Sequence, residues 1–280
     1  MIISTLGFAV MTALIKHLEA IHVIMIIFFR CGITAIISTN YLLRHKISLI
    51  GTHQRLLIAR AVVGLTSMTL FFITIQRIPL GASMTIKYLA PFFSLVMAAL
   101  WLREKILVKQ WLLFVFVLLG VFLLKGYDGR IDTLNLILGL GAAFFGGAVY
   151  VIIRRIGERE HPLVIVNYFM GLGTLISGIA LIKYWSSPTL YEFCILILIG
   201  ITGYIGQKYM TASFQKEETN VVAPLKYLEL VYAFIIGYVL FGESYPFLSF
   251  VGIMIIVFSF TANYWITARK KSIKTSIKKT

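Results

Sequence analysis

The 280-residue sequence is poor in charged side chains: Asp, Glu, Lys and Arg make up only 13% of it, whereas 59% is hydrophobic. Soluble globular domains carry about 25% charged residues and about 45–50% apolar ones, so this composition excludes a soluble domain. The few charges gather in short segments between long apolar runs, which is typical of a chain that crosses a membrane many times. The length accommodates about ten spans of ~20 residues and no separate soluble domain.

Cysteine is scarce, and the motifs of soluble enzymes are missing. Cys31 and Cys194 both fall inside apolar runs, so a structural disulfide is not expected. There is no Gly-rich phosphate loop followed by Lys and Ser or Thr, no H-E-x-x-H and no G-x-S-x-G. All five histidines fall at or beyond the ends of the apolar runs. The sequence therefore gives no support for an ATP-driven pump, and neither a cofactor nor a metal is expected.

The net charge of +15 is explained by membrane topology rather than by nucleic acid. Lys and Arg lie in loop-sized clusters and in a basic tail, residues 269–280, which holds six of them. If the N-terminus is inside, the inner linkers hold ten Lys and Arg and the outer linkers five, before the tail is added. Because inner loops are enriched in these residues, both termini are expected to be cytoplasmic. Nucleic acid is not an expected partner.

The apolar runs predict an all-α integral membrane protein with ten transmembrane helices. The expected spans are 1–16, 22–43, 56–76, 80–102, 107–125, 134–153, 162–183, 190–214, 220–241 and 246–267.

One tripeptide occurs twice inside these spans. Lys87-Tyr88-Leu89 and Lys226-Tyr227-Leu228 are 139 positions apart. A lysine within a span costs about 2.5–3.5 kcal/mol on insertion scales, so its recurrence at one depth needs an explanation. The same shift pairs further residues without a gap: Gln76 with Gln215, Glu104 with Glu243, Glu19 with Glu158, His22 with His161, and Gly32 with Gly171.

The shift also aligns two rows of small residues, Ala61, Gly64 and Ser67 with Gly200, Gly203 and Gly206. Small residues at every third position let helices approach closely in lipid, although such residues are also generally abundant in membrane helices. Each half of the chain holds five spans, and an odd number turns the second half upside down. The sequence therefore predicts two inverted five-helix repeats, residues 1–126 and 134–268, followed by the tail 269–280. In such folds the substrate site lies near the midplane between the repeats.

The two lysines are candidates for the substrate site. Lys87 would lie in the outer part of its span and Lys226 in the inner part of the equivalent span, so that they flank a central cavity from opposite sides. Their ammonium groups could attract an anionic or zwitterionic substrate group or act in alternating gates. The alternative is that each lysine extends to the nearest membrane interface, which costs little.

Glu229 is the acidic residue expected well inside a span. It follows Lys226 by three positions, so the two residues share a helix face and could pair. An intramembrane carboxylate in a transporter is a candidate proton site, and a static ion pair with Lys226 is the alternative. The first half has Ala90 at the equivalent position, so the symmetry is broken there.

Other polar residues within the spans complete the candidate set. Arg30 and Arg60 could line the cavity, although Arg60 is close enough to a span end to reach the interface. Pro91 is expected to kink its span by removing a backbone hydrogen bond. The further candidates for cavity-lining positions are Tyr88, Tyr227, Tyr168 and Gln207.

Short segments in both halves form a further pattern. In the first half they are residues 60–64, Ile78-Pro79-Leu80-Gly81-Ala82, residues 88–92 and Arg103-Glu104-Lys105; in the second half they are residues 223–229 and Phe241-Gly242-Glu243. Together these segments resemble the EamA-type transporters of the drug/metabolite transporter superfamily. The resemblance covers nearly the whole chain. It implies the ten-helix inverted-repeat fold in the cytoplasmic (inner) membrane, with a cavity lined by the first four spans of each half.

The resulting functional hypothesis is a secondary transporter that moves a small polar metabolite, an amino acid or a derivative, by alternating access. The resemblance keeps a S-adenosylmethionine-type or organic-anion carrier as alternatives. A membrane-embedded enzyme acting on a lipid-linked substrate and a passive channel are alternatives of other classes. The expected partners are the small-molecule substrate and the lipid bilayer, with proton coupling through Glu229 and a homodimer as options.

Overall fold

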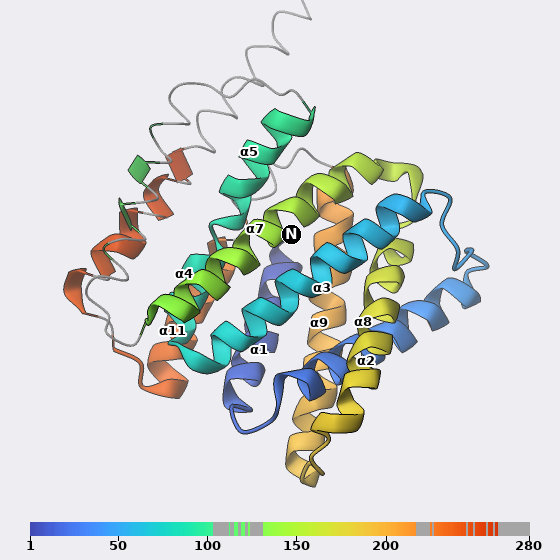
Figure 1. The fold of residues 1–280 in the computed structure, drawn as a ribbon, viewed down its shortest axis with the longest axis horizontal. Helices are drawn as coiled ribbons and strands as arrows, with labels where there is room; N and C mark the ends of the chain where they lie inside the picture. The colour runs from blue at the N-terminus through green and yellow to red at the C-terminus, as the bar shows by residue number, and fades with distance from the viewer. Residues whose placement is uncertain are drawn as a thin grey trace, which may run out of the picture.

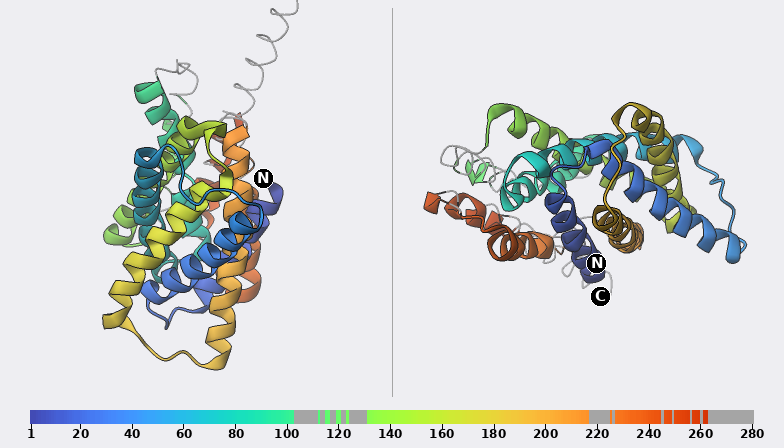
Figure 2. Two further views of the ribbon diagram at one scale, coloured as in Figure 1. Left: turned by 90° about the vertical axis from the view of Figure 1, so that its right-hand side faces the viewer. Right: turned by 90° about the horizontal axis from the view of Figure 1, so that it is seen from below.

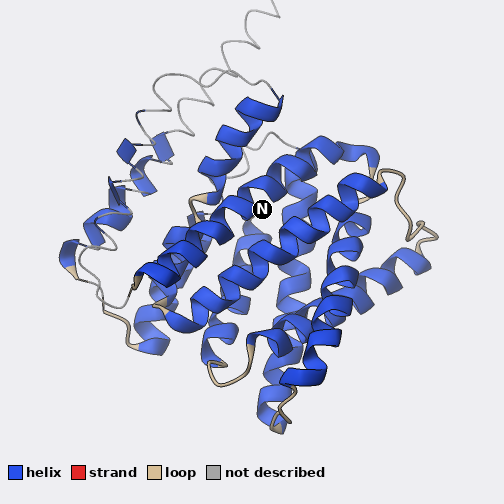
Figure 3. Ribbon diagram, in the orientation of Figure 1, coloured by secondary structure: helices blue, strands red, loops and turns tan. Residues whose placement is uncertain are grey.

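The structure is a computed structural model, and every regular element in the part it describes is a helix (Figure 3). The described residues are 1–102, 112, 115–116, 119–120, 123, 131–216, 225, 227–244, 246–248, 250–255, 257–259 and 261–262. The helices are α1 (Ile2–His17), α2 (Val23–Arg44), α3 (Gln54–Arg77), α4 (Leu80–Lys87), α5 (Ala90–Leu102), α7 (Thr133–Ile156), α8 (Pro162–Tyr184), α9 (Leu190–Lys216) and α11 (Tyr227–Phe241), with a short 3₁₀ helix, η1, at Gly157–Arg159.

The apolar runs became helices close to the expected limits. Within the described residues, six helical stretches are long and apolar enough to cross a membrane: α2, α3, α4 with α5, α7 with η1, α8 and α9. This confirms an all-helical chain with several membrane spans. Most of the expected span 107–125 and parts of 220–241 and 246–267 lie outside the described residues, as does the tail 269–280.

The expected span 80–102 is two helices rather than one. Helix α4 ends at Lys87, Tyr88 and Leu89 form a turn, and α5 begins at Ala90. The cause is Pro91, which has no N–H and whose ring would clash with the carbonyl four residues earlier, that of Lys87. The structure therefore has a break in the helix where a kink was expected from Pro91, and Leu80–Trp101 remains one candidate membrane span.

Specific side chains fix where two of the helices begin. The His22 ring accepts a hydrogen bond from the backbone N–H of Ile24 at the start of α2, at 3.3 Å. The His161 ring accepts one from the N–H of Leu163 at the start of α8, at 3.2 Å. These contacts satisfy backbone donors that a helix leaves free in its first turn.

The helices form one elongated bundle (Figures 1 and 2). Helices α2 and α8 pack together at one end of the bundle, and α4, α5 and α11 lie at the other. Between them α3 packs along α7, and α1 packs along α9. Helix α4 contacts both α11 and α7, so segments from both halves of the chain meet at this end of the bundle.

Small residues permit the close approach of α1 and α9, as their spacing indicates. A Cβ atom added to Gly7 would lie 3.0 Å from the backbone of Gly206, and one added to Gly206 would lie 2.9 Å from the ring of Phe8. At Gly200 an added Cβ would lie 2.5 Å from Ile33 of α2. Gly200 and Gly206 therefore act as contact points for α2 and α1 respectively, in agreement with the packing expected of small residues in lipid.

Candidate functional site

A buried ion pair between α4 and α11 joins Lys87 to Glu229. The Nζ atom of Lys87, at the end of α4, lies 3.6 Å from Oε1 of Glu229 in α11. The carboxylate is fully buried, and 21% of the lysine side chain is exposed. Glu229 therefore has its partner in the other half of the chain. Lys226, the partner expected from sequence, lies outside the described residues.

Aromatic rings hold Lys87 in the interior. Its ammonium lies 3.9 Å from the ring centroid of Phe71 in α3 and 5.9 Å from that of Phe8 in α1. Both distances allow cation–π attraction, which is strongest when water is excluded. The ammonium of Lys87 is therefore held among α1, α3 and α11.

Arg30 is buried in the centre of α2 with three sulfur atoms as hydrogen-bond acceptors. Its side chain is 3% exposed. The guanidinium donates to the Sδ atoms of Met11 at 3.3 Å, Met68 at 2.7 Å and Met170 at 3.6 Å. A thioether is a weak acceptor and carries no charge, so these contacts position the guanidinium without neutralising it.

Arg60 lies beside Arg30 and is even more deeply enclosed, with 1% of the residue exposed. Its Cζ atom lies 4.1 Å from the ring centroid of Phe169, and that of Arg30 lies 5.9 Å from the same ring. The Nε and Nη1 atoms of Arg60 have no hydrogen-bond partner among the described residues. The guanidiniums of Arg60 and Arg30 therefore lie against the same ring. The side chain of Arg60 is enclosed by the surrounding helices.

The two guanidiniums thus share one ring and lack a carboxylate. Across the described ranges, the ion pairs are Lys16 with Glu19, His53 with Glu160, and Lys87 with Glu229; none involves Arg30 or Arg60. Burying an unpaired ion costs several kcal/mol even after the protein relaxes. We name Arg30, Arg60, Phe169 and the sulfur atoms of Met11, Met68 and Met170 the arginine centre.

Glycines on two helices make room for the arginine centre. The side chain of Arg60 folds back over Gly64, one turn later in α3, where an added Cβ would collide with Arg60 Nη1. On α9 an added Cβ at Gly203 would lie 3.1 Å from Met11 Sδ and 3.4 Å from the Arg30 side chain. Both positions belong to the rows of small residues that the sequence aligns.

The remaining expected residues are placed around this region or outside it. Gln207 is buried one turn from Gly203 on α9 and donates to Thr211 Oγ1 at 3.3 Å. Tyr88 is buried at the break between α4 and α5. Tyr227 begins α11, and its side chain is not among those described.

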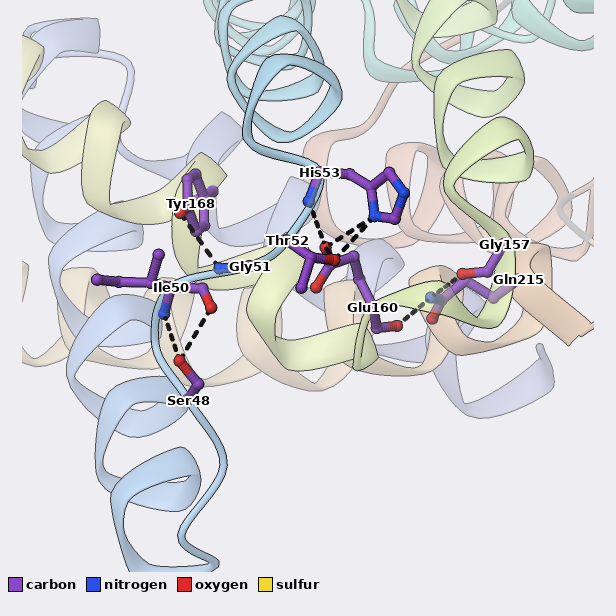
Figure 4. Close-up of polar contacts among 9 residues, drawn as sticks. All are labelled: Ser48, Ile50, Gly51, Thr52, His53, Gly157, Glu160, Tyr168 and Gln215. Carbon is purple, nitrogen blue, oxygen red and sulfur yellow. Dashed lines mark hydrogen bonds and ion pairs between the residues drawn. The ribbon is translucent and has the colours of Figure 1, made fainter.

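Tyr168 does not face the arginine centre. Its hydroxyl accepts a hydrogen bond from the backbone N–H of Gly51 at 3.3 Å, in the loop between α2 and α3 (Figure 4). The neighbouring residue Phe169 supplies the ring between the two arginines instead. The shift of 139 positions pairs Phe169 with Arg30, which is the one sequence signal that could have found it.

The loop beside Tyr168 is held by Glu160. Its Oε1 atom accepts from the Thr52 hydroxyl and from the His53 backbone N–H, both at 2.7 Å (Figure 4). Burial raises the pKa of this carboxyl, but the hydrogen bonds from Thr52 and His53 outweigh burial and leave the pKa below its usual value. Glu160 lies outside the spans and has a structural role at the junction of α7, α8 and the α2–α3 loop.

Equivalent glutamines make equivalent bonds in the two halves of the chain. The Gln76 side-chain amide donates to the carbonyls of Leu18 and Ile21, at 3.2 and 2.9 Å. The Gln215 amide donates to the carbonyls of Gly157 and Glu160, at 2.7 and 2.8 Å (Figure 4). Each of these three positions in the second half lies 139 residues after its counterpart. The histidine caps at the starts of α2 and α8 obey the same shift.

Comparison with known proteins gives matches along nearly the whole chain. The profile described as EamA-like transporter family matches residues 1–125 and 133–265. The pseudopaline exporter CntI of Pseudomonas aeruginosa (strain UCBPP-PA14) is 30% identical over 262 residues, which covers 91% of each chain. Human solute carrier family 35 member G1 is 28% identical over 262 residues, covering 86% of this chain and 71% of that protein.

Two further matches bear on function and on fold. The S-adenosylmethionine uptake transporter of Rickettsia bellii (strain RML369-C) is 24% identical over 225 residues, covering 80% of this chain and 77% of that protein. One crystal structure matches with a TM-score of 0.71 at 15% identity, over 95% of this chain and 98% of that one. At that identity the match supports the fold alone.

Proposed function

This chain belongs to the EamA-like transporter family, and we propose that it is a secondary transporter that moves a small polar metabolite by alternating access. The relatives named above are transporters, and the helices are long and apolar enough to cross a membrane. The substrate that we propose is an amino acid or a derivative of one. We further propose that the membrane is the cytoplasmic one and that both termini lie inside, as the distribution of Lys and Arg predicts.

The observation that carries this proposal is the repeated bonding of Gln76 and Gln215. Two side chains 139 positions apart meet backbone carbonyls at the same sequence separations, 58 and 55 residues. Agreement at this level supports two halves with the same internal structure. In transporters built from inverted repeats, the halves exchange conformations, and this exchange opens the site to each side in turn.

The contact pattern between helices supports the same arrangement. If the halves are repeats, α1 is equivalent to α7 and α3 to α9, so the packing of α1 on α9 has the packing of α3 on α7 as its counterpart. Helix α2, packed on α8, would lie next to the pseudo-two-fold axis. The Lys87–Glu229 pair then links equivalent spans of the two halves.

Glu229 is our candidate for proton coupling. Protonation would remove its negative charge, and Lys87 would lose its partner across the boundary between α4 and α11. The ion pair would therefore break when Glu229 is protonated and form again when it is deprotonated. Helices α4 and α11 would be held together only while the pair is formed. Intramembrane carboxylates with a cationic partner commonly serve such relays in pumps and transporters.

Radiolabelled transport in proteoliposomes tests the proposal. We would compare the wild type with Lys87→Ala, Lys226→Ala and Glu229→Gln, using a panel of amino acids, S-adenosylmethionine and organic acids, with each solute supplied outside and, separately, inside. Transport should be saturable, and each variant should lower it or remove its dependence on a pH gradient. Unchanged transport in all three variants would refute the site assignment.

Labelling of a cysteine introduced into the tail tests the orientation. A membrane-impermeant reagent should fail to label it in intact cells and should label it after lysis. Labelling in intact cells would mean that the tail lies outside and that the proposed orientation is wrong.

A further inference from the structure

We infer that the arginine centre is a carboxylate-binding site, and that the transported metabolite is an organic anion with an apolar or soft body. This inference rests on the proposed transport function and narrows its substrate class. It differs from the expectation drawn from the two lysines, because Lys87 is already paired with Glu229.

The charge balance of the interior carries the first step. Lys87 and Glu229 neutralise each other, whereas Arg30 and Arg60 remain as two positive charges that meet no carboxylate among the described residues. Two like charges against one ring, both at most 3% exposed, are unfavourable unless a negative charge joins them. A bound anion supplies that charge.

The geometry of the donors carries the second step. Arg60 lies over Phe169 with its Cζ 4.1 Å from the ring centroid, while Nε and Nη1 have no partner in the described structure. An arginine offers donors in a planar fork that matches the two oxygens of a carboxylate. A buried arginine that is fixed by packing and still has open donors is prepared for that ligand.

The surroundings distinguish a carboxylate from a phosphate. Phosphate sites typically recruit backbone N–H groups at a helix N-terminus. Arg30 and Arg60 instead project from within α2 and α3, well past the first turns, and their neighbours are the rings of Phe72 and Phe169 and methionine sulfurs. Such walls suit a ligand whose remaining atoms are hydrocarbon, aromatic or thioether.

A charge series of equal size tests the inference by binding. Purified protein in detergent would be titrated with succinate, succinamate and succinamide, which carry two, one and no negative charges, and with inorganic phosphate. The melting temperature should rise most with succinate, less with succinamate and least with succinamide. The affinity for succinate should fall roughly 30-fold or more in Arg30→Gln and Arg60→Gln, as expected when one partner of a buried charge pair is removed.

Matched variants separate binding from folding. Arg55→Gln alters an exposed arginine on the same helix and should bind succinate like the wild type. In the absence of ligand, Arg60→Gln should melt at or above the wild-type temperature, because it removes an unpaired buried charge. Gly64→Ala keeps the charge but displaces the end of a flexible side chain, so it should fold and bind succinate about tenfold more weakly. Gly171→Ala, where an added Cβ meets nothing within 4 Å, is its control.

Several results would overturn the inference. They are an equal response to all three succinate derivatives, no response to any of them, stronger binding of phosphate, or the same response in Arg60→Gln as in Arg55→Gln. The transport assay distinguishes this failure from failure of the proposed function. Uptake of a neutral or cationic solute that Arg60→Gln leaves unchanged would refute the carboxylate site and leave a transporter in place.

Discussion

Two glutamines near the ends of their spans, 139 positions apart, make the same bonds, whereas two charged residues buried within the spans have partners of another chemical kind at that shift. Gln76 and Gln215 bind equivalent carbonyls. By contrast, Arg30 is paired by the same shift with Phe169, and Glu229 with Ala90. The conserved bonds fix how each half folds, and the unlike buried residues include the groups that could recognise a ligand. A ligand without two-fold symmetry requires this kind of difference.

The largest effect should come from breaking the Lys87–Glu229 pair. The first half has Ala90 at the position equivalent to Glu229, so it has no carboxylate there. Glu229→Gln leaves the lysine charge in the interior without its carboxylate and should lower the free energy of unfolding by about 3 kcal/mol. Thermal unfolding in detergent measures this loss. The double variant Lys87→Met with Glu229→Leu should recover most of the stability while abolishing transport.

Glu19→Gln is the control, because it alters an exposed carboxylate whose ion pair with Lys16 should contribute less than about 1 kcal/mol to stability. An equal loss in Glu19→Gln and Glu229→Gln would mean that the buried pair contributes no more than a surface one. The buried charges would then be less distinct from the span ends than the structure indicates.

The next largest effect tests the repeated bonds themselves. Gln76→Leu and Gln215→Leu each leave two backbone carbonyls without their donor, so each should cost about 1–3 kcal/mol, and the two losses should be similar. The double variant should show the sum, because distant sites add. Gln54→Leu alters an exposed glutamine at the start of α3 and should have little effect. A loss confined to one of the two glutamines would break the equivalence of the halves.

The smallest effect should be a loss of hydrogen-exchange protection in acid at one of the two equivalent junctions, the one that contains Glu160. The pKa of Glu160 is lowered in the folded protein, so its contribution to stability is present above its unfolded pKa and is lost as pH falls through the folded value. The equivalent residue in the first half, Ile21, has no charge to lose. Below about pH 4.5 the amide of His53, which donates to Glu160, should therefore lose about fivefold in protection from hydrogen exchange, about 1 kcal/mol.

Amides near Ile21 should keep their protection over the same range, after correction for the intrinsic pH dependence of exchange. Glu160→Gln should remove the difference between the two junctions. If acid weakened both junctions equally, the response would have to come from another group.

The sequence predicted most of the helices because apolar runs and their polar ends are local signals. The expected span 22–43 became Val23–Arg44, and 162–183 became Pro162–Tyr184. The contact between Lys87 and Glu229 was not foreseen, since the spacing of Glu229 from Lys226 offered a nearer partner. The contacts of Met11, Met68 and Met170 with Arg30 were not predicted either. Methionine is common in apolar spans, and only the packing of the helices brings three sulfur atoms to one guanidinium.

The short helix α4 has a mechanical consequence. It is about 12 Å long, and each end is held by a carboxylate from far along the chain. Glu243 accepts a hydrogen bond from the N–H of Leu80 at its start, and Glu229 pairs with Lys87 at its end. Since the helix is interrupted by the turn at Tyr88 and Leu89, α4 is coupled more directly to α11 than to α5. If the two halves move as rigid bodies, the boundary between them would therefore run through this turn. Helix α4 would then move with the second half of the chain, which contains α11, although it belongs to the first half by sequence.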